Sequence, residues 1–180
     1  FVNLFFLNVH GMDGGTFSLV GALSFGLVVI GTLFVPEVKD RYGYKVAIVL
    51  IQALAILFLI LMATTEYYSE MWYASILAVA FFVIRQPLMN VAGPMTSELT
   101  LSYVGRRNQE LVSALNSAIW SGSWYISSQI FRILRQSGMN YANIFFITAA
   151  MYTLGVVWYY YLIHDYHKRK QQGLIEEEEE

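Results

Sequence analysis

Apolar residues fill five long stretches of this chain, and charged residues gather between them. The stretches are residues 17–36, 46–64, 72–94, 111–131 and 142–163. Each has about twenty residues, and a helix of that length, rising about 1.5 Å per residue, matches a hydrocarbon core of about 30 Å. Residues 46–62 lack the alternation of a membrane β-strand, so we predict helices rather than a barrel. The pattern predicts an all-α, polytopic transmembrane helix bundle.

A shorter apolar segment, residues 1–9, precedes these stretches. It is too short to cross a bilayer, and it lacks the basic start and the cleavage site of a signal peptide. We expect it to be the end of another helix that begins upstream of Phe1, which would make the chain a fragment.

The composition leaves little room for a separate soluble domain, because 57% of the residues are hydrophobic, 13% are charged and the mean hydropathy is +0.49. We therefore expect residues 1–167 to form one bundle and residues 168–180 to form a charged tail that ends in the solvated run Glu176–Glu180. The chain has no cysteine, which excludes disulfides, thiolate metal sites and cysteine nucleophiles. We expect neither a metal nor a cofactor.

Basic residues are distributed unevenly among the connecting segments. One set of alternate segments carries most of them, namely Lys39, Arg41, Lys45, Arg106, Arg107, Lys168, Arg169 and Lys170. The other set carries only Arg132 and Arg135. Because short cytoplasmic loops are enriched in Lys and Arg, this asymmetry predicts a cytoplasmic first set and a cytoplasmic C-terminus. Topology alone accounts for these scattered charges, so we expect no nucleic-acid partner.

Two of the five stretches are more polar than the others. In residues 72–94 and just beyond, Gln86, Asn90, Gly93 and Ser97 recur at helical spacing, with Arg85 on the flank. In residues 111–131, one face carries Ser113, Asn116, Ser117, Trp120, Trp124 and Ser127. Two such stripes could line one wet cavity. Serine and glycine also allow membrane helices to approach closely, so packing is the alternative.

Arg85 lies deep within its predicted span. A charge at the bilayer centre costs at least about 3 kcal/mol, so it needs water, a partner or a ligand. Arginine stays protonated and cannot carry a proton cycle, but it can hold a carboxylate or phosphate through two hydrogen bonds. A structural ion pair is the alternative. Pro87 and Pro94 predict kinks in the same helix, either for movement or as static features.

Small residues in the first full span predict close packing. Gly21, Gly26 and Gly31 recur every five residues, which is not the spacing of the dimerisation motif. We expect them to pack against a neighbouring helix.

The segment between the first two full spans contains the most specific string of the chain, Asp40-Arg41-x-Gly43-x-Lys45. It resembles the loop between the second and third helices of the major facilitator superfamily, repeated between the eighth and ninth. Pro36 stands at the position of the leading glycine of that pattern, and Tyr44 replaces a basic residue. Gly43 permits a tight turn, and Asp40 can cap a helix or pair with a basic residue.

The resemblance implies that residues 1–9 end the seventh helix of that fold and that the five full spans are the eighth to twelfth. Residues 85–94 look like the tenth helix of a bacterial exporter-like subgroup. In the family the ninth and twelfth helices are peripheral, and residues 46–64 and 142–163 are indeed the least polar spans here. The resemblance thus implies the carboxyl-terminal half of a multi-pass protein of the bacterial inner membrane.

The implied function is secondary active transport of a small organic solute by alternating access. The substrate-cavity residues would be Arg85, Gln86, Asn90, Asn116, Trp120, Trp124, Asn3 and Asn8. A conformational latch would comprise Asp40, Arg41, Gly43 and Lys45. The partners would be the solute, the lipid bilayer, the amino-terminal half of the same protein and, where transport is proton-coupled, a proton carried by Glu98 or by that other half.

Two other classes of function compete with transport. A membrane enzyme would need a nucleophile with its base, or a metal cluster, at membrane depth. His10, His164 and His167 lie in predicted loops or the tail, and no paired carboxylates face a span, so we do not expect an enzyme. A non-transporting receptor or scaffold with the same fold remains the alternative.

Overall fold

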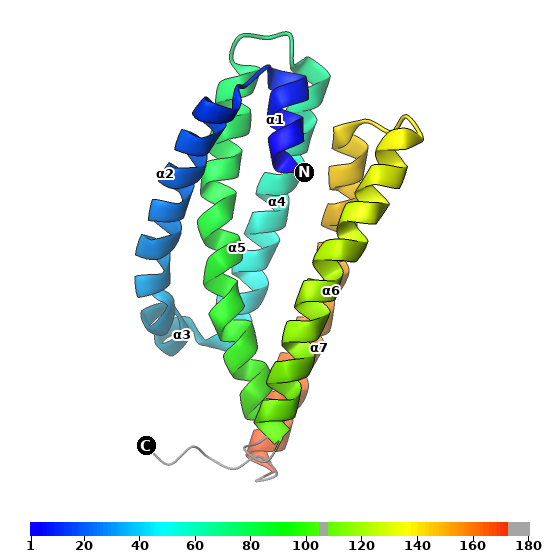
Figure 1. Ribbon diagram of the computed structural model, residues 1–180. Coiled ribbons are helices and arrows are strands. Elements are labelled where there is room, and N and C mark those ends of the chain that lie inside the picture. The colour runs from blue at the N-terminus through cyan, green and yellow to red at the C-terminus, as the bar shows by residue number, and fades with distance from the viewer. Residues whose placement is uncertain (105–107, 173–180) are drawn as a thin grey trace.

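The computed structural model describes residues 1–104 and 108–172, and all elements in these ranges are helices (Figure 1). They are α1 (Val2–His10), α2 (Gly14–Leu33), α3 (Val35–Tyr44), the π-helix η1 (Lys45–Leu50), α4 (Ile51–Thr64), the 3₁₀-helix η2 (Thr65–Tyr68), α5 (Ala74–Val104), α6 (Gln109–Gln136) and α7 (Tyr141–Gln171). The predicted loop basic residues Arg106 and Arg107 and the acidic run Glu176–Glu180 lie outside the described residues.

Four helical segments within the described residues are long and apolar enough to cross a membrane: Gly14–Leu33, Val35–Tyr68, Ala74–Val104 and Tyr141–Gln171. This confirms the all-helical class and four of the five predicted spans. The remaining prediction, residues 111–131, is helical within α6 but too polar to meet the same criterion. The physical reason is its serines and amides, which occupy positions that the other spans give to aliphatic side chains.

The segment predicted as a loop, residues 36–45, is mostly helical, and this corrects the sequence analysis. Helix α3 begins after Phe34 with Pro36 in its first turn, where proline suits a helix, and with Glu37 beside it. The regular conformation breaks only at Gly43, which has φ 71° and ψ 170°. The tight turn predicted for Gly43 is therefore confirmed, but it is confined to one residue between two helices.

Two helices extend beyond the spans predicted from the sequence. Helix α5 runs unbroken through Pro87 and Pro94 to Val104, because each proline removes a single backbone hydrogen bond while its neighbours keep theirs. Helix α7 extends to Gln171, so the basic residues Lys168–Lys170 form its last turn instead of a tail. Cations are favourable there because the helix dipole is negative at its carboxyl end.

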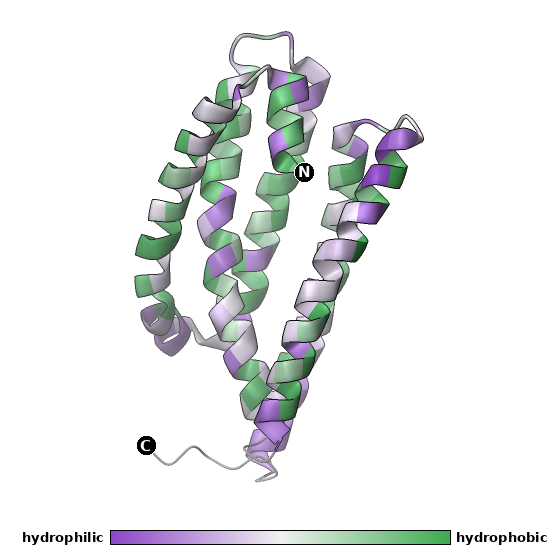
Figure 2. Ribbon diagram, in the orientation of Figure 1, coloured by the Kyte–Doolittle hydropathy of each residue, from purple (hydrophilic) through white to green (hydrophobic). Residues whose placement is uncertain are grey.

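Helix α5 stands in the middle of the bundle, flanked by α2 and α4, and α7 packs against α4 (Figure 1). In that view the upper end carries the α1–α2 turn and η2, and the lower end carries α3, the carboxyl end of α5 and the start of α6. Figure 2 shows hydrophilic residues mainly at the two ends and in the middle of α5.

The core consists of two hydrophobic clusters stacked along the bundle. The upper cluster includes Phe5, Phe6, Leu59, Met62, Phe82 and Phe145. The lower cluster includes Ala47, Ile48, Met95, Leu99 and Ile163. Between them, α4 carries the half-buried Gln52 and α5 carries the buried Arg85. The packed core is thus divided at mid-depth by polar side chains.

Of the three glycines predicted to allow close packing, only Gly31 does so. A Cβ atom at Gly31 would lie 3.3 Å from the Val91 side chain and 3.6 Å from Pro87 on α5. At Gly21 and Gly26 it would meet nothing within 4 Å. A side chain at Gly31 would thus press on α5, whereas no neighbour among the described residues requires a glycine at positions 21 and 26.

Candidate functional site

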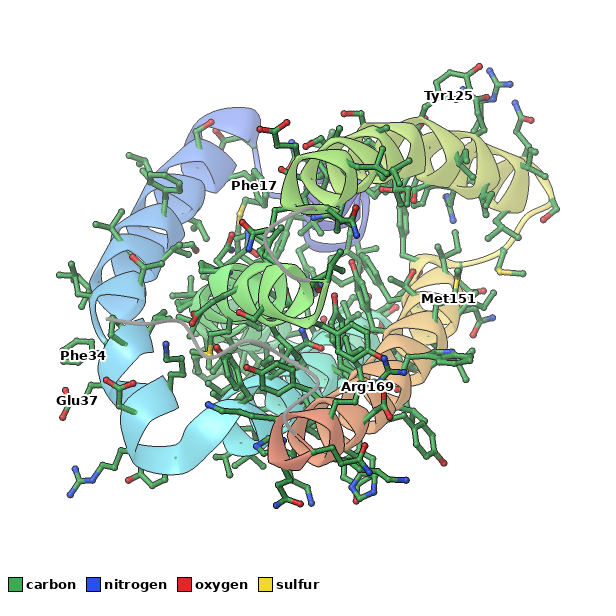
Figure 3. All side chains as sticks on the ribbon, turned by 90° about the horizontal axis from the view of Figure 1, so that it is seen from below. Phe17, Phe34, Glu37, Tyr125, Met151 and Arg169 are labelled. Carbon is green, nitrogen blue, oxygen red and sulfur yellow. The ribbon has the colours of Figure 1, made fainter. Side chains whose placement is uncertain are left out.

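Helix α6 is exposed along most of its length. Its only buried residue is Phe131, and every residue from Ser113 to Ser127 is exposed. Trp120 and Trp124 are 67% and 64% exposed, and their rings pack edge to face with centroids 6.0 Å apart. Figure 3 shows the side chain of Tyr125 pointing away from the bundle. The predicted cavity residues Asn116, Trp120 and Trp124 therefore lie on a free surface.

Helix α6 contacts the other helices mainly at its two ends. At the upper end the Phe131 ring stacks on Phe1 with centroids 4.1 Å apart and lies beside Tyr141. At the lower end α6 adjoins α5, and Figure 1 shows the two helices diverging above that point. The middle of α6 thus has no packing partner among the described residues that would bury it.

An open groove of about 550 Å³ separates the lower parts of α5 and α6. It is lined by Leu101 on α5 and by Gln109, Glu110, Ser113, Ala114 and Ser117 on α6. Ser113 and Ser117 belong to the polar stripe predicted from the sequence. The structure therefore places these two serines of the stripe beside the groove, whereas Asn116, Trp120 and Trp124 do not line it.

The polar residues of α5 do not share one face. Arg85 is 9% exposed and lies on the packed stripe with Ala78 and Phe82. Asn90 is exposed, and its Nδ2 donates a hydrogen bond to the Gln86 carbonyl at 2.8 Å. Five residues separate Arg85 from Asn90, which turns their side chains about 140° apart around the helix. Arg85 is thus buried in the bundle while Asn90 faces outward.

The Arg85 guanidinium lacks a carboxylate partner among the described residues. The two ion pairs there, Lys39 with Glu98 and Arg169 with Asp165, both lie at the lower end. The Nε atom of Arg85 is buried without a hydrogen-bond partner, and the neighbouring group that interacts with the guanidinium is the Tyr152 phenol on α7. A buried charge with only a neutral neighbour is destabilising until an anion or water reaches it.

The two asparagines predicted as cavity residues on α1 have different surroundings. Asn3 is exposed. The Nδ2 of Asn8 donates to the Tyr141 hydroxyl at 2.7 Å and so ties α1 to the start of α7. The structure does not bring either residue together with Asn90 or Asn116. The predicted kink residues Pro87 and Pro94 also differ in their surroundings. Pro87 lies beside Gly31 of α2, whereas Pro94 is exposed.

The connection between the α3 region and α5 is made by neighbours of the predicted latch residues. Lys39 Nζ lies 2.8 Å from Glu98 Oε1, and the Tyr44 hydroxyl donates to the same oxygen at 2.7 Å. Asp40 and Arg41 are exposed, with the Arg41 guanidinium 6.0 Å from the Tyr42 ring. The sequence analysis did not pair Glu98 with Lys39, because 59 residues separate them and only folding brings them together.

The lower end has a second link that the sequence analysis missed. The Tyr103 hydroxyl on α5 donates to Asp165 Oδ2 on α7 at 2.6 Å, and Arg169 Nε lies 2.8 Å from the same oxygen. The i, i+4 spacing of Asp165 and Arg169 was a detectable signal for the ion pair. The contact with Tyr103 was not detectable, since it depends on how α5 and α7 cross.

His10 occupies a polar junction at the upper end. Its Nε2 lies 3.0 Å from Thr65 Oγ1, and its Nδ1 lies 3.4 Å from Ser75 Oγ. Burial among α1, η2 and α5 lowers the pKa of the His10 imidazole below its ordinary value, because the charged form loses hydration. His10 is therefore a neutral connector between three elements.

Comparison with known proteins adds no assignment: no protein-family model, no curated protein and no solved structure matches this chain. The functional argument consequently depends on the geometry of α5 and α6. That geometry provides an uncovered polar stripe, an open groove and a buried guanidinium.

Proposed function

We propose that this chain forms the carboxyl-terminal half of a secondary active transporter of the major facilitator type, which moves a small organic solute by alternating access. The observation that carries the proposal is the uncovered polar stripe of α6, from Ser113 to Ser127. A helix that crosses a bilayer cannot turn serines and an asparagine toward acyl chains without cost, so such a stripe is covered by protein or by water.

The amino-terminal half of the same protein is the partner that would cover this stripe. Helix α6 is 28 residues long and is anchored mainly at its ends, which leaves its middle available to a second bundle. In transporters of this kind two bundles rock about a site near the midplane. The groove between α5 and α6 would then belong to a water-filled path that both halves line.

The charge distribution supports an orientation with the lower end in the cytoplasm. The basic residues of α3 and of the last turn of α7 lie at that end, and Arg132 and Arg135 lie at the upper end. This agrees with the enrichment of Lys and Arg in short cytoplasmic segments. The proposal places the protein in the bacterial inner membrane with a cytoplasmic C-terminus.

Arg85 indicates the charge of the solute. It is buried at mid-depth, its Nε has no partner, and no carboxylate pairs with it within the described residues. A guanidinium in this state gains most from a carboxylate or phosphate that arrives during the cycle. We therefore favour an anionic organic solute, which would reach Arg85 when α5 and α6 move relative to each other.

Cysteine accessibility tests whether the α6 stripe lines water. Because these 180 residues contain no cysteine, a thiol reagent can label a single introduced cysteine in them without reacting elsewhere in this part of the protein. In full-length protein in membrane vesicles, Ser113→Cys and Ser117→Cys should react with a charged methanethiosulfonate reagent. The matched controls Leu115→Cys and Ile119→Cys, on the apolar face of the same helix, should be protected by lipid. Equal labelling of both faces, or labelling of neither, contradicts the proposed path.

Counterflow measures transport directly. Proteoliposomes that contain the full-length protein are loaded with unlabelled carboxylates or phosphate esters, and entry of the labelled counterpart is followed over time. Exchange of at least one anionic solute supports the proposal. Absence of exchange for every anionic and neutral solute tried, with labelling of Ser117→Cys retained, would favour a receptor or scaffold instead.

A further inference from the structure

A second pocket lies at the lower end, on the side of the bundle away from α6. It has a volume of about 280 Å³ and is formed by the junction of α3 with η1 and by the lower part of α7. Its polar lining comprises Tyr42, Lys45, Tyr160, His164 and His167. The proposed transport path does not use this pocket, because its walls are α7 and the start of the α4 segment.

The lining has a positive character. It contains a lysine and two histidines, and none of the described residues that line it is acidic. Lys45 Nζ is held 4.8 Å from the centre of the Tyr160 ring. Glu98 binds Lys39 and also accepts a hydrogen bond from the hydroxyl of Tyr44, a lining residue, and Asp165 binds Arg169. An anion entering the pocket would meet the Lys45 ammonium beside the Tyr160 ring.

The histidines add hydrogen-bonding capacity. His167 Nδ1 lies 2.7 Å from the Ile163 carbonyl, which orients the ring and leaves Nε2 available to a ligand. His164 is exposed at the pocket edge. Imidazole N–H groups, the lysine ammonium and tyrosine hydroxyls all donate hydrogen bonds, so the site suits a phosphate oxygen.

The depth of the pocket matches a lipid headgroup. Along α7, Tyr160 lies about 28 Å and His167 about 39 Å from Tyr141, at about 1.5 Å per residue. A hydrocarbon core of about 30 Å that starts near the beginning of α7 therefore ends at the level of this pocket. Exposed Trp158 and Tyr161 lie at the same level, where aromatic rings favour the membrane interface.

We propose that this pocket binds the phosphate group of an anionic phospholipid from the adjacent leaflet. Basic pockets between transmembrane helices are suited to such headgroups, and the acyl chains of the lipid would lie against the exposed apolar surface of α7. The inference requires that the helices span a membrane, but it does not depend on transport. Free inorganic phosphate has the same oxygen chemistry, so the test must separate these two sources.

Native mass spectrometry of the full-length protein in detergent tests the proposal. Palmitoyl-oleoyl phosphatidylglycerol should be retained as one bound lipid in preference to the zwitterionic phosphatidylcholine with the same chains. Lys45→Gln should weaken this preference about fivefold, because a lysine near anionic lipid contributes about 1 kcal/mol. The double variant His164→Gln with His167→Gln should also weaken the preference, because it replaces two groups that line the pocket.

The control variant Lys168→Gln removes the same charge at the same end of the bundle, from the last turn of α7 and outside the pocket lining, and it should keep the lipid preference. An equal loss in Lys168→Gln and Lys45→Gln would overturn the proposal in favour of a diffuse surface charge. Displacement of phosphatidylglycerol by millimolar inorganic phosphate would overturn the lipid assignment. Retention of the lipid in that buffer supports a headgroup site.

Discussion

Helices α4 and α6 follow the pattern of a soluble protein, which is unexpected for helices in a bilayer. Helix α4 is almost wholly apolar, and five of its 14 residues are buried. Helix α6 carries the serines, Asn116 and Gln129, and only one of its 28 residues is buried. In water the polar helix would lie outside because water solvates it. In a bilayer the same arrangement leaves the polar surface without a suitable solvent.

The difference shows that apolarity alone does not identify the helices that face lipid. Helix α4 is enclosed by α5 and α7 because its side chains complete both core clusters. Helix α6 adds Phe131 to the upper cluster and little else to either cluster. Its polar stripe indicates instead where further protein or water must lie.

The largest effect is expected at Arg85, which is buried in the bundle without a carboxylate partner among the described residues. Arg85→Ala should insert and fold but reduce transport of an anionic solute about 100-fold, since hydrogen bonds between charged partners contribute about 3 kcal/mol. Initial rates of counterflow measure this effect. Arg132→Ala, an exposed arginine of α6, is the control and should transport normally. Wild-type rates in Arg85→Ala would reduce Arg85 to a structural role.

A matched pair of leucine substitutions tests the packing contrast directly. Leu59 on α4 is 1% exposed, and Leu115 on α6 is 53% exposed. Leu59→Ala should lower the free energy of unfolding by about 2–5 kcal/mol through a core cavity, whereas Leu115→Ala should change it by less than about 0.5 kcal/mol. Denaturant titration in detergent micelles measures both. Equal losses would mean that α6 is packed by protein on its apolar face.

A smaller effect is expected where α2 meets α5. Gly31→Val should destabilise the bundle by about 1–3 kcal/mol, because the added side chain would overlap Val91 and Pro87. Gly26→Val is the control, since a Cβ there meets nothing within 4 Å. The midpoint of thermal unfolding compares the two variants. If Gly26→Val were the more damaging, the close approach of α2 and α5 would lie at a different level.

The smallest effect concerns pH at the upper junction. The pKa of His10 is lowered by burial, so the folded state binds fewer protons than the unfolded state at mildly acidic pH. The free energy of unfolding is therefore unaffected by His10 above pH 6.5, the ordinary pKa of histidine. It decreases as the pH falls from there toward the lower pKa of His10 in the folded state. We expect a loss below about 1 kcal/mol because the ring is only half-buried. Unfolding at pH 7.5 and pH 5.5 measures it.

The isosteric variant His10→Gln serves as the control for that measurement. It keeps hydrogen-bonding capacity toward Thr65 and Ser75 but has no proton to bind in this pH range. Its stability should change less between the two pH values. A pH dependence equal to that of the wild type would assign the effect to another group.

Several features of the fold could be predicted from the sequence because they depend on local periodicity. The apolar runs fixed the positions of the helices, and Gly43 marked the one break between α3 and η1. Within α6, helical spacing correctly placed Ser113 and Ser117 on one face, which lines the groove. The length of α3 was missed because its proline and charged residues also fit a loop.

The candidate site was less predictable, because contacts between distant residues depend on how helices cross. The sequence grouped Arg85 with Gln86 and Asn90, but the fold buries Arg85 and leaves Asn90 exposed. The sequence also named Asp40 and Arg41 as the latch, whereas the fold pairs Lys39 with Glu98. A rotation of about 100° about a helix axis, the step from one residue to the next, suffices to exchange such partners.

The sequence by itself determined that the chain is helical and suited to a membrane, because hydrophobicity and helix length are properties of each segment alone. Only the tertiary structure decided which side of each helix is covered. Coverage depends on the rotation and crossing of neighbouring helices, and these follow from the summed fit of many side chains rather than from any one segment.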